Sequence, residues 1–91
     1  MPMVIVTAQV QDPVKWEAGF RTHADLFRIY TLRSPIHFTM AGNEIAICFE
    51  PENLDTFRRT MESQATEEAM AFDGVKRETV KTFVLDKEMK L

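Results

Sequence analysis

The amino-acid sequence predicts an α+β fold in which one four-stranded antiparallel sheet carries its helices on a single face. Apolar residues recur with strand and helix periods in the order β-α-β-β-α-β. The length of 91 residues leaves room for one domain, residues 1–91, with one core. The composition, with 45% hydrophobic and 27% charged residues, is typical of a globular protein.

The first strand and the first helix are expected at residues 3–10 and 13–30. Residues 3–10 are β-branched or otherwise apolar at most positions, which predicts a strand covered on both faces. Asp12 supplies an N-cap acceptor and Pro13 suits the first helical position, so the helix begins there. One side of this helix is an apolar stripe with spacings of four, three and four residues, made of Trp16, Phe20, His23 and Phe27.

The next two strands are expected to form a β-hairpin. Residues 36–40 alternate, so that every second residue from Ile36 shares a face, and residues 44–50 supply the second strand. Gly42 in the intervening turn allows the positive φ that tight turns often require.

Residues 53–72 have helical spacing and predict a second helical region with a break near Ser63. Phe57 and Met61 should face the sheet, because they lie on one side of this helix. Gly74 marks the helical C-terminus.

The last strand is expected at residues 79–85, followed by a charged tail at 86–91. The full order of elements is that of the ferredoxin-like fold, which places both helices on one face of the sheet. The other face also carries apolar residues, so it must be buried against another chain. A twofold homodimer meets this requirement.

Several short segments, together with the order of elements, carry a resemblance to a known family. They are Asp12-Pro13-Val14-Lys15-Trp16, Phe20-Arg21-Thr22-His23, Arg33-Ser34, Phe49-Glu50-Pro51-Glu52-Asn53-Leu54, and the run from Glu68-Ala69-Met70 to Gly74-Val75. Through them the chain resembles, over nearly its whole length, the dimeric α/β-barrel superfamily of antibiotic biosynthesis monooxygenase-like proteins. The resemblance implies sheets paired across a dimer and a ligand cavity between helices and sheet. The superfamily includes cofactor-free oxygenases, haem-degrading monooxygenases and lactone isomerases, among which the fold does not select.

His23 is the candidate catalytic residue, because its titratable imidazole stands in an otherwise aromatic stripe that faces the sheet. Burial lowers the pKa of an imidazole and favours the neutral form, which can accept or donate a proton. The resemblance implies that Trp16, Phe20 and Phe27 line the substrate cavity. His37, on the second strand, faces either this cavity or the dimer interface and completes the candidate substrate-binding set. The alternative for His23 is a structural histidine that is hydrogen-bonded to a carbonyl or carboxylate.

The aromatic stripe with its histidine, together with what the resemblance implies, favours a small cofactor-independent oxygenase or isomerase that acts on a hydrophobic, aromatic or polyketide-like molecule, with His23 as acid or base. The alternative is a non-catalytic dimeric module that binds a small ligand or has a structural role. This alternative stays open because no second catalytic group stands at a defined spacing from His23.

Composition argues against several other classes of protein. The net charge of −3 lacks the basic excess that nucleic-acid binding needs. No apolar run approaches the roughly 20 residues that span a bilayer, so no membrane insertion is expected. The single cysteine, Cys48, cannot form an internal disulfide and fits a reducing cytoplasm.

Metal, haem and N-terminal proline chemistry find little support in the sequence. His23 and His37 lack a third metal ligand at a diagnostic spacing, so no metal site is expected. The asparagine, tryptophan and histidine set of haem degraders is not convincingly present, although His23 could serve as an axial ligand, and no cofactor is expected. Pro2 matches the proline base of tautomerases, but a retained Met1 removes the basicity of its nitrogen and the order of elements differs.

Overall fold

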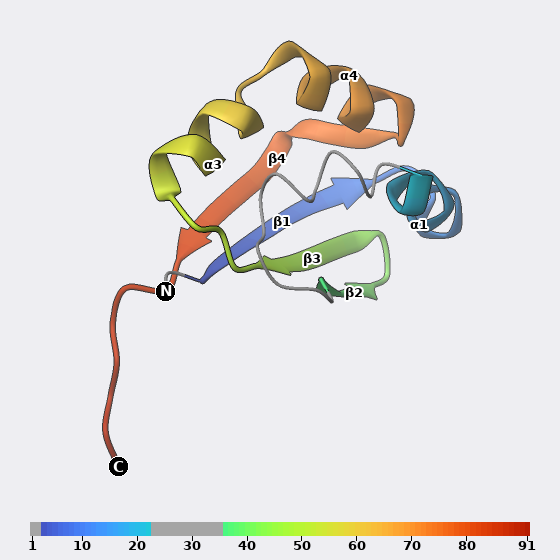
Figure 1. Ribbon diagram of the computed structural model, residues 1–91. Helices are drawn as coiled ribbons and strands as arrows, with labels where there is room; N and C mark the ends of the chain where they lie inside the picture. Colours follow the sequence, from blue (N-terminus) through green and yellow to red (C-terminus); the bar gives the residue numbers. More distant parts are fainter. Residues whose placement is uncertain (1–2, 23–35) are drawn as a thin grey trace.

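The computed structural model describes residues 3–22 and 36–91, which form the helices and strands of Figure 1. In chain order these elements are β1 (Val4–Val10), α1 (Pro13–Thr22), β2 (His37–Ala41), β3 (Glu44–Phe49), α3 (Leu54–Met61), α4 (Gln64–Phe72) and β4 (Val75–Val84). The strands form one antiparallel sheet in the order β2-β3-β1-β4. The predicted ferredoxin-like α+β fold is therefore confirmed. Within these residues no helix is long and apolar enough to cross a membrane.

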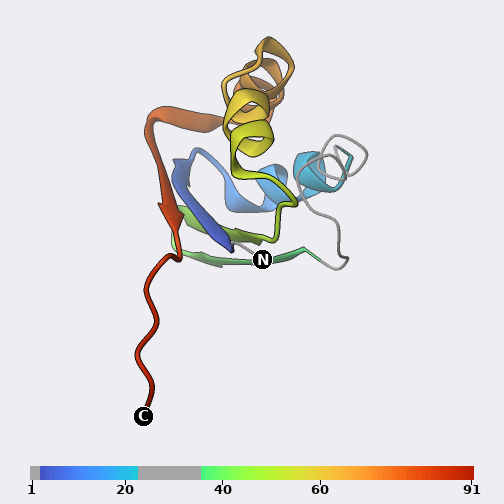
Figure 2. The same ribbon diagram turned by 60° about the vertical axis from the view of Figure 1, so that its left-hand side comes forward.

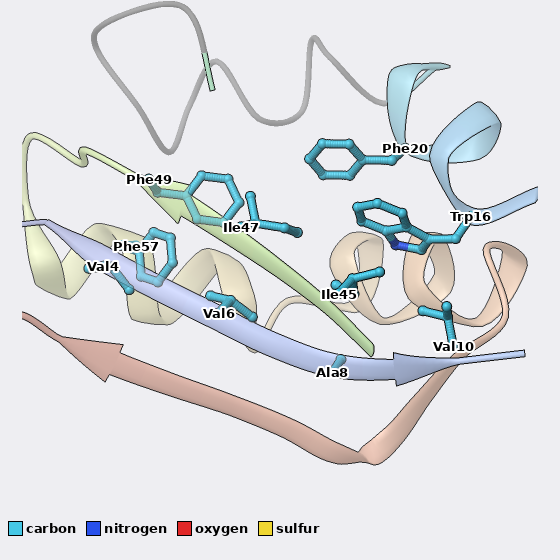
Figure 3. Packing of buried hydrophobic residues seen from close by; sticks show 10 residues of the cluster. All are labelled: Val4, Val6, Ala8, Val10, Trp16, Phe20, Ile45, Ile47, Phe49 and Phe57. Atoms are coloured by element: carbon cyan, nitrogen blue, oxygen red, sulfur yellow. The ribbon is translucent and has the colours of Figure 1, made fainter. Parts of the chain in front are cut away.

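The three helices of the described residues lie on the same side of the sheet, as Figure 2 shows from a turned view. The core lies between these helices and the sheet, and Figure 3 shows side chains from β1, β3, α1 and α3 meeting in it. Alternate residues of β1, from Val4 to Val10, are buried against the helices. On α3, Phe57 is 1% exposed and its ring centroid lies 5.5 Å from that of Phe49. The predicted inward side of this helix is thereby confirmed, and Met61 is partly buried against the same core.

The opposite face of the sheet carries no helix of the described residues, and we call it the bare face. The cross-strand register places on it Ile5, Thr7 and Gln9 of β1, Glu44, Ala46 and Cys48 of β3, His37 and Thr39 of β2, and Lys81 and Phe83 of β4. In the single chain Ile5 and Thr7 are half-buried, whereas Gln9 and Phe83 are exposed. The residues that the structure describes therefore cover β1 on the helix side only, whereas the sequence predicts covering on both faces.

Local signals place the helix ends where the sequence predicts them. The predicted break near Ser63 is present, since α3 ends at Met61 and α4 begins at Gln64. Ser63 caps α4, and its Oγ accepts a hydrogen bond from the Thr66 backbone N–H at 3.3 Å. Asn53 caps α3 in the same way and accepts from the backbone N–H of Asp55 at 2.8 Å. Gly74 follows α4 with a φ of 75°, a conformation that few other residues adopt.

The last strand begins at Val75, four residues before the predicted start at residue 79. The reason is an irregularity in its pairing with β1: Thr7 pairs with Lys81, but Gln9 pairs with Lys76. In this gap the Gln9 N–H donates to Thr79 Oγ1 at 2.8 Å. A side-chain oxygen thus accepts a hydrogen bond in place of a backbone carbonyl. The irregularity interrupts the alternation of buried and exposed residues along β4, and this alternation is the pattern by which a strand is predicted from sequence. The predicted remainder of the first helix, residues 23–30, lies outside the described residues.

Candidate functional site

A small apolar cavity lies between the helices and the sheet, with a volume of about 50 Å³. Strands β1 and β3 supply its floor, and α1, α3, α4 and β4 supply its walls. Its described lining is apolar apart from Thr66, Asp73 and the indole N–H of Trp16. This cavity occupies the place where the sequence analysis expected a ligand.

Three aromatic rings are packed together beside the cavity. Trp16 and Phe20 stack with ring centroids 4.8 Å apart and 18° between their planes. The ring of Phe38, from β2, meets both edge-on, at 5.7 Å from Trp16 and 5.3 Å from Phe20. Such offset and edge contacts are the favourable geometries for aromatic pairs. Trp16 and Phe20 are 2% and 6% exposed and so are shielded from water, whereas Phe38 is half-buried.

The start of α1 positions this aromatic cluster. Asp12 Oδ1 accepts hydrogen bonds from the backbone N–H of Val14 at 3.0 Å and of Lys15 at 3.3 Å, which fixes the first turn. The backbone N–H of Trp16 donates to the backbone carbonyl of Asp12 at 2.8 Å. Trp16 therefore stands one turn into the helix, and Phe20 follows one turn later on the same side.

Thr66 and Asp73 are the two polar side chains that are buried among the described residues. The Thr66 hydroxyl donates to the Thr60 carbonyl at 2.6 Å and lies 3.2 Å from Ser63 Oγ, so it stabilises the junction of α3 and α4. Asp73 caps the end of α4 and is 5% exposed. Asp73 is thus an acidic group in the wall of an apolar cavity, a placement that is frequent at functional sites.

The Asp73 carboxyl group packs directly against α1 at Gly19. A Cβ atom at position 19 would lie 2.0 Å from Asp73 Oδ1 and 2.8 Å from its Cγ. Glycine at this position therefore lets α1 and the end of α4 approach closely. Sequence reasoning did not single out either residue, although a glycine inside a helix, which costs about 1 kcal/mol relative to alanine, was a usable signal.

The structure brings together only part of the predicted site. Trp16 and Phe20 lie side by side at the cavity, whereas His23 and Phe27 lie outside the described residues. His37 does not join them: it is exposed on the bare face, in register with Cys48. A shallow groove of about 270 Å³ runs there between β2 and β3, with Ile5 in its lining.

Within residues 3–22 and 36–91 there is no group of three or more histidine, cysteine or acidic side chains that could hold a metal ion. In this part of the chain, His37 of β2 and Cys48 of β3 lie opposite each other on adjacent strands, but no third metal ligand accompanies them.

Comparison with solved structures shows the same fold in several bacterial proteins. A proposed antibiotic biosynthesis monooxygenase from Deinococcus radiodurans matches with a TM-score of 0.64 and 10% sequence identity, over 100% of this chain and 96% of that one. The chain has the fold of the antibiotic biosynthesis monooxygenase-like proteins. The cofactor-independent oxygenase SnoaB from Streptomyces nogalater matches with a TM-score of 0.56 and 15% identity, over 99% of this chain and 95% of that one. A protein from Agrobacterium tumefaciens matches with a TM-score of 0.64 and 13% identity, over 97% and 94%.

The likeness at these identities is one of fold. No protein-family profile matches the sequence, and no curated protein matches it.

Proposed function

We propose that this protein is a small cofactor-independent enzyme, an oxygenase or isomerase, that acts on a hydrophobic aromatic or polyketide-like molecule. The observation that carries the proposal is the aromatic cluster of Trp16, Phe20 and Phe38 beside an apolar cavity in the helix-to-sheet layer. Ligand pockets for small molecules are lined mainly by such side chains, with few polar groups. The fold shared with SnoaB supports the same kind of activity.

His23 is the proposed acid or base. It follows Phe20 by three residues and Trp16 by seven, so the helical period predicted from the sequence puts all three in one stripe. Oxygenation and isomerisation of such molecules can both begin with removal of a proton next to a carbonyl group. A neutral imidazole in an apolar cavity is suited to accept that proton.

Binding of an aromatic molecule requires the cavity to open. Its volume of about 50 Å³ is well below the roughly 150 Å³ of an apolar cavity that binds benzene. Some of the side chains that line it, of which Trp16 is one, must therefore move when a ligand enters. Trp16 is the one tryptophan of the sequence, so its fluorescence reports this opening directly.

The experiment is a screen of aromatic ketones and lactones that follows Trp16 fluorescence for binding, and oxygen uptake or absorbance change for turnover. With an active compound, His23→Ala should lower kcat by about 100-fold or more, the usual contribution of a general base. Lys15→Ala, on the exposed side of α1, is the matched control and should leave kcat unchanged. Full turnover by a folded His23→Ala variant would rule out the acid or base role.

The small cavity favours the second candidate, a dimeric module that is not catalytic. Close stacking of Trp16 on Phe20 fills most of the space, as expected of a structural core. In this case none of the compounds changes Trp16 fluorescence, and His23→Ala changes only the free energy of unfolding.

A homodimer formed through the bare face is part of the proposal. Phe83 and Met3 are 49% and 42% exposed there, and Ile5 between them is only half-buried. Burying about 400 Å² of such surface would contribute about 10 kcal/mol per chain before the costs of association. Sedimentation equilibrium should give a dimer at micromolar concentration. A compact 10.5 kDa monomer under these conditions would exclude it.

A further inference from the structure

A second and larger space lies between β4 and the helices α3 and α4, and we call it the edge groove. Its volume is about 380 Å³, which is within the range of roughly 300–1,000 Å³ for sites that bind small molecules. The cavity beside the aromatic cluster, at about 50 Å³, is below that range. Because β4 is an edge strand of the sheet, the groove lies at the border of the protein (Figure 1).

The cavity and the edge groove share one wall. Met61, Met70 and Val80 each line both spaces, so their side chains stand between the two. All three residues are half-buried. Two of them are methionines, whose unbranched side chains adapt their shape readily. Met61 is also the last residue of α3, next to the break before α4. Movement of two flexible side chains would therefore join the cavity to the groove.

The edge groove carries positive charge that is available to a ligand. Its polar lining consists of Arg58, Arg77, Glu62 and Thr82. Arg77 forms an ion pair with Glu67. Arg58 is exposed, and it forms no ion pair with another of the described residues. A guanidinium group beside an apolar wall is suited to hold the anionic end of a molecule whose remainder is apolar.

The cavity has the opposite character. The acidic Asp73 lines the cavity but not the groove, whereas Arg58 lines the groove but not the cavity. An acidic side chain disfavours an anion inside the cavity, and an arginine favours one in the groove. A ligand with one anionic group would thus be oriented with its apolar part toward the aromatic cluster.

We propose that the cavity and the edge groove form one binding site for an apolar aromatic molecule with a single anionic group. The apolar part enters the cavity between Met61 and Met70, and the anionic group binds Arg58. The inference rests on the proposed function, since it takes the cavity as the substrate site. It adds the charge of the substrate and the route by which the substrate enters.

Two fluorescent probes test the preference for an anion. Anilinonaphthalenesulfonate and phenylnaphthylamine share their aromatic rings, and only the first carries a sulfonate group. The wild-type protein should bind the anionic probe more tightly, and Arg58→Gln should weaken that binding about tenfold, as expected for loss of a hydrogen bond to a charged group. Arg59→Gln removes the same charge from an exposed position outside the groove lining and should change the affinity less than about twofold. Equal affinity of the wild type for both probes, or equal effects of both variants, would overturn the inference.

Nuclear magnetic resonance of isotope-labelled methionine methyl groups and of the Trp16 indole N–H locates the bound anionic probe. Binding should shift the signals of Met61, Met70 and Trp16 and leave those of Met3 and Met89 unchanged. Shifts at the two wall methionines without one at Trp16 would confine the probe to the groove and overturn the joined site. A shift at Trp16 without shifts at these methionines would place the entrance elsewhere and would overturn it as well.

The remaining outcomes separate this inference from the proposed function. Turnover that depends on His23 but is unchanged in Arg58→Gln would overturn the inference and leave the proposed function standing. Binding of the anionic probe as described, with no turnover of any compound in the screen, would support the site and refute the enzyme. Probe affinity that falls as the chain concentration rises would show that a second copy occupies the edge groove, and this too would overturn the inference.

Discussion

Substitution of Gly19 by alanine should destabilise this protein, although the same change stabilises most helices. Gly19 lies inside α1, where alanine is favoured over glycine by about 1 kcal/mol. The new methyl carbon, however, would lie 2.0 Å from Asp73 Oδ1. The Asp73 side chain is 5% exposed, so it has little room to rotate away.

The magnitude follows from these two opposing terms. Overpacking of a dense interior costs about 1–3 kcal/mol, and a contact of 2.0 Å belongs at the upper end of that range. After the gain of about 1 kcal/mol from helix propensity, the net loss should be about 2 kcal/mol. In an Asp73→Ala background the two clashing atoms, Oδ1 and Cγ, are gone, so Gly19→Ala should stabilise by about 1 kcal/mol. The coupling between positions 19 and 73 should thus be about 3 kcal/mol.

Urea unfolding of the four proteins in this double-mutant cycle, followed by Trp16 fluorescence and circular dichroism, measures the coupling. All samples need the same chain concentration, because association stabilises the folded state. The reasoning is refuted if Gly19→Ala has the same effect on the free energy of unfolding with Asp73 present and absent. A stabilisation of about 1 kcal/mol in the wild-type background would likewise show that α1 and Asp73 do not touch.

Three further substitutions test the packing and the helix ends in the same unfolding assay. Phe57→Ala should cost about 3–5 kcal/mol as a core truncation, whereas Phe72→Ala, at a position 74% exposed, should cost less than about 0.5 kcal/mol. Similar losses for both would show that the buried side of α3 is misassigned. Asn53→Ala should lower the free energy of unfolding by about 1 kcal/mol, because the cap of α3 is lost. Glu52→Ala, at the exposed neighbouring position, is the control, and equal losses for the two variants would exclude the cap. Glu17→Gln, which breaks a surface ion pair with Arg21, should change stability by less than about 0.5 kcal/mol, and a larger loss would contradict its surface role.

The order of elements could be predicted because each depends on local signals. The cap residues Asp12, Asn53 and Ser63 and the glycine after α4 act within a few residues of their own position. The start of β4 could not be predicted in this way. It depends on Thr79 accepting a hydrogen bond from Gln9, and these residues are far apart in the sequence.

The candidate site could be predicted only where a helix period defines it. Trp16 and Phe20 share a stripe on α1, and the structure stacks them as that stripe implies. The contact of Gly19 with Asp73 is tertiary, so no local pattern announces it. The sequence could not decide which face of the sheet His37 lies on, because both faces carry apolar residues. Alternation along a strand then shows which residues share a face, but not which face packs against the helices.

The polarity of the bare face changes along the strands, and this change bears on how two copies meet. At one end, Ile5 is in register with Cys48 and Phe83, and His37 of β2 is opposite Cys48, so this row has no acidic, lysine or arginine side chain. Four residues further along β1, on the same face, Gln9 is in register with Glu44 and Lys76.

A partner that buried the whole face would have to remove the second row from water, which is costly for charged groups. Contact concentrated on the row of Ile5 avoids this cost. Ile5→Asp should therefore weaken the dimer at least tenfold in sedimentation equilibrium, while Gln9→Asp should change the dissociation constant less than twofold. Equal weakening by both variants would mean that the partner covers the face evenly, and the gradient would then have no bearing on assembly.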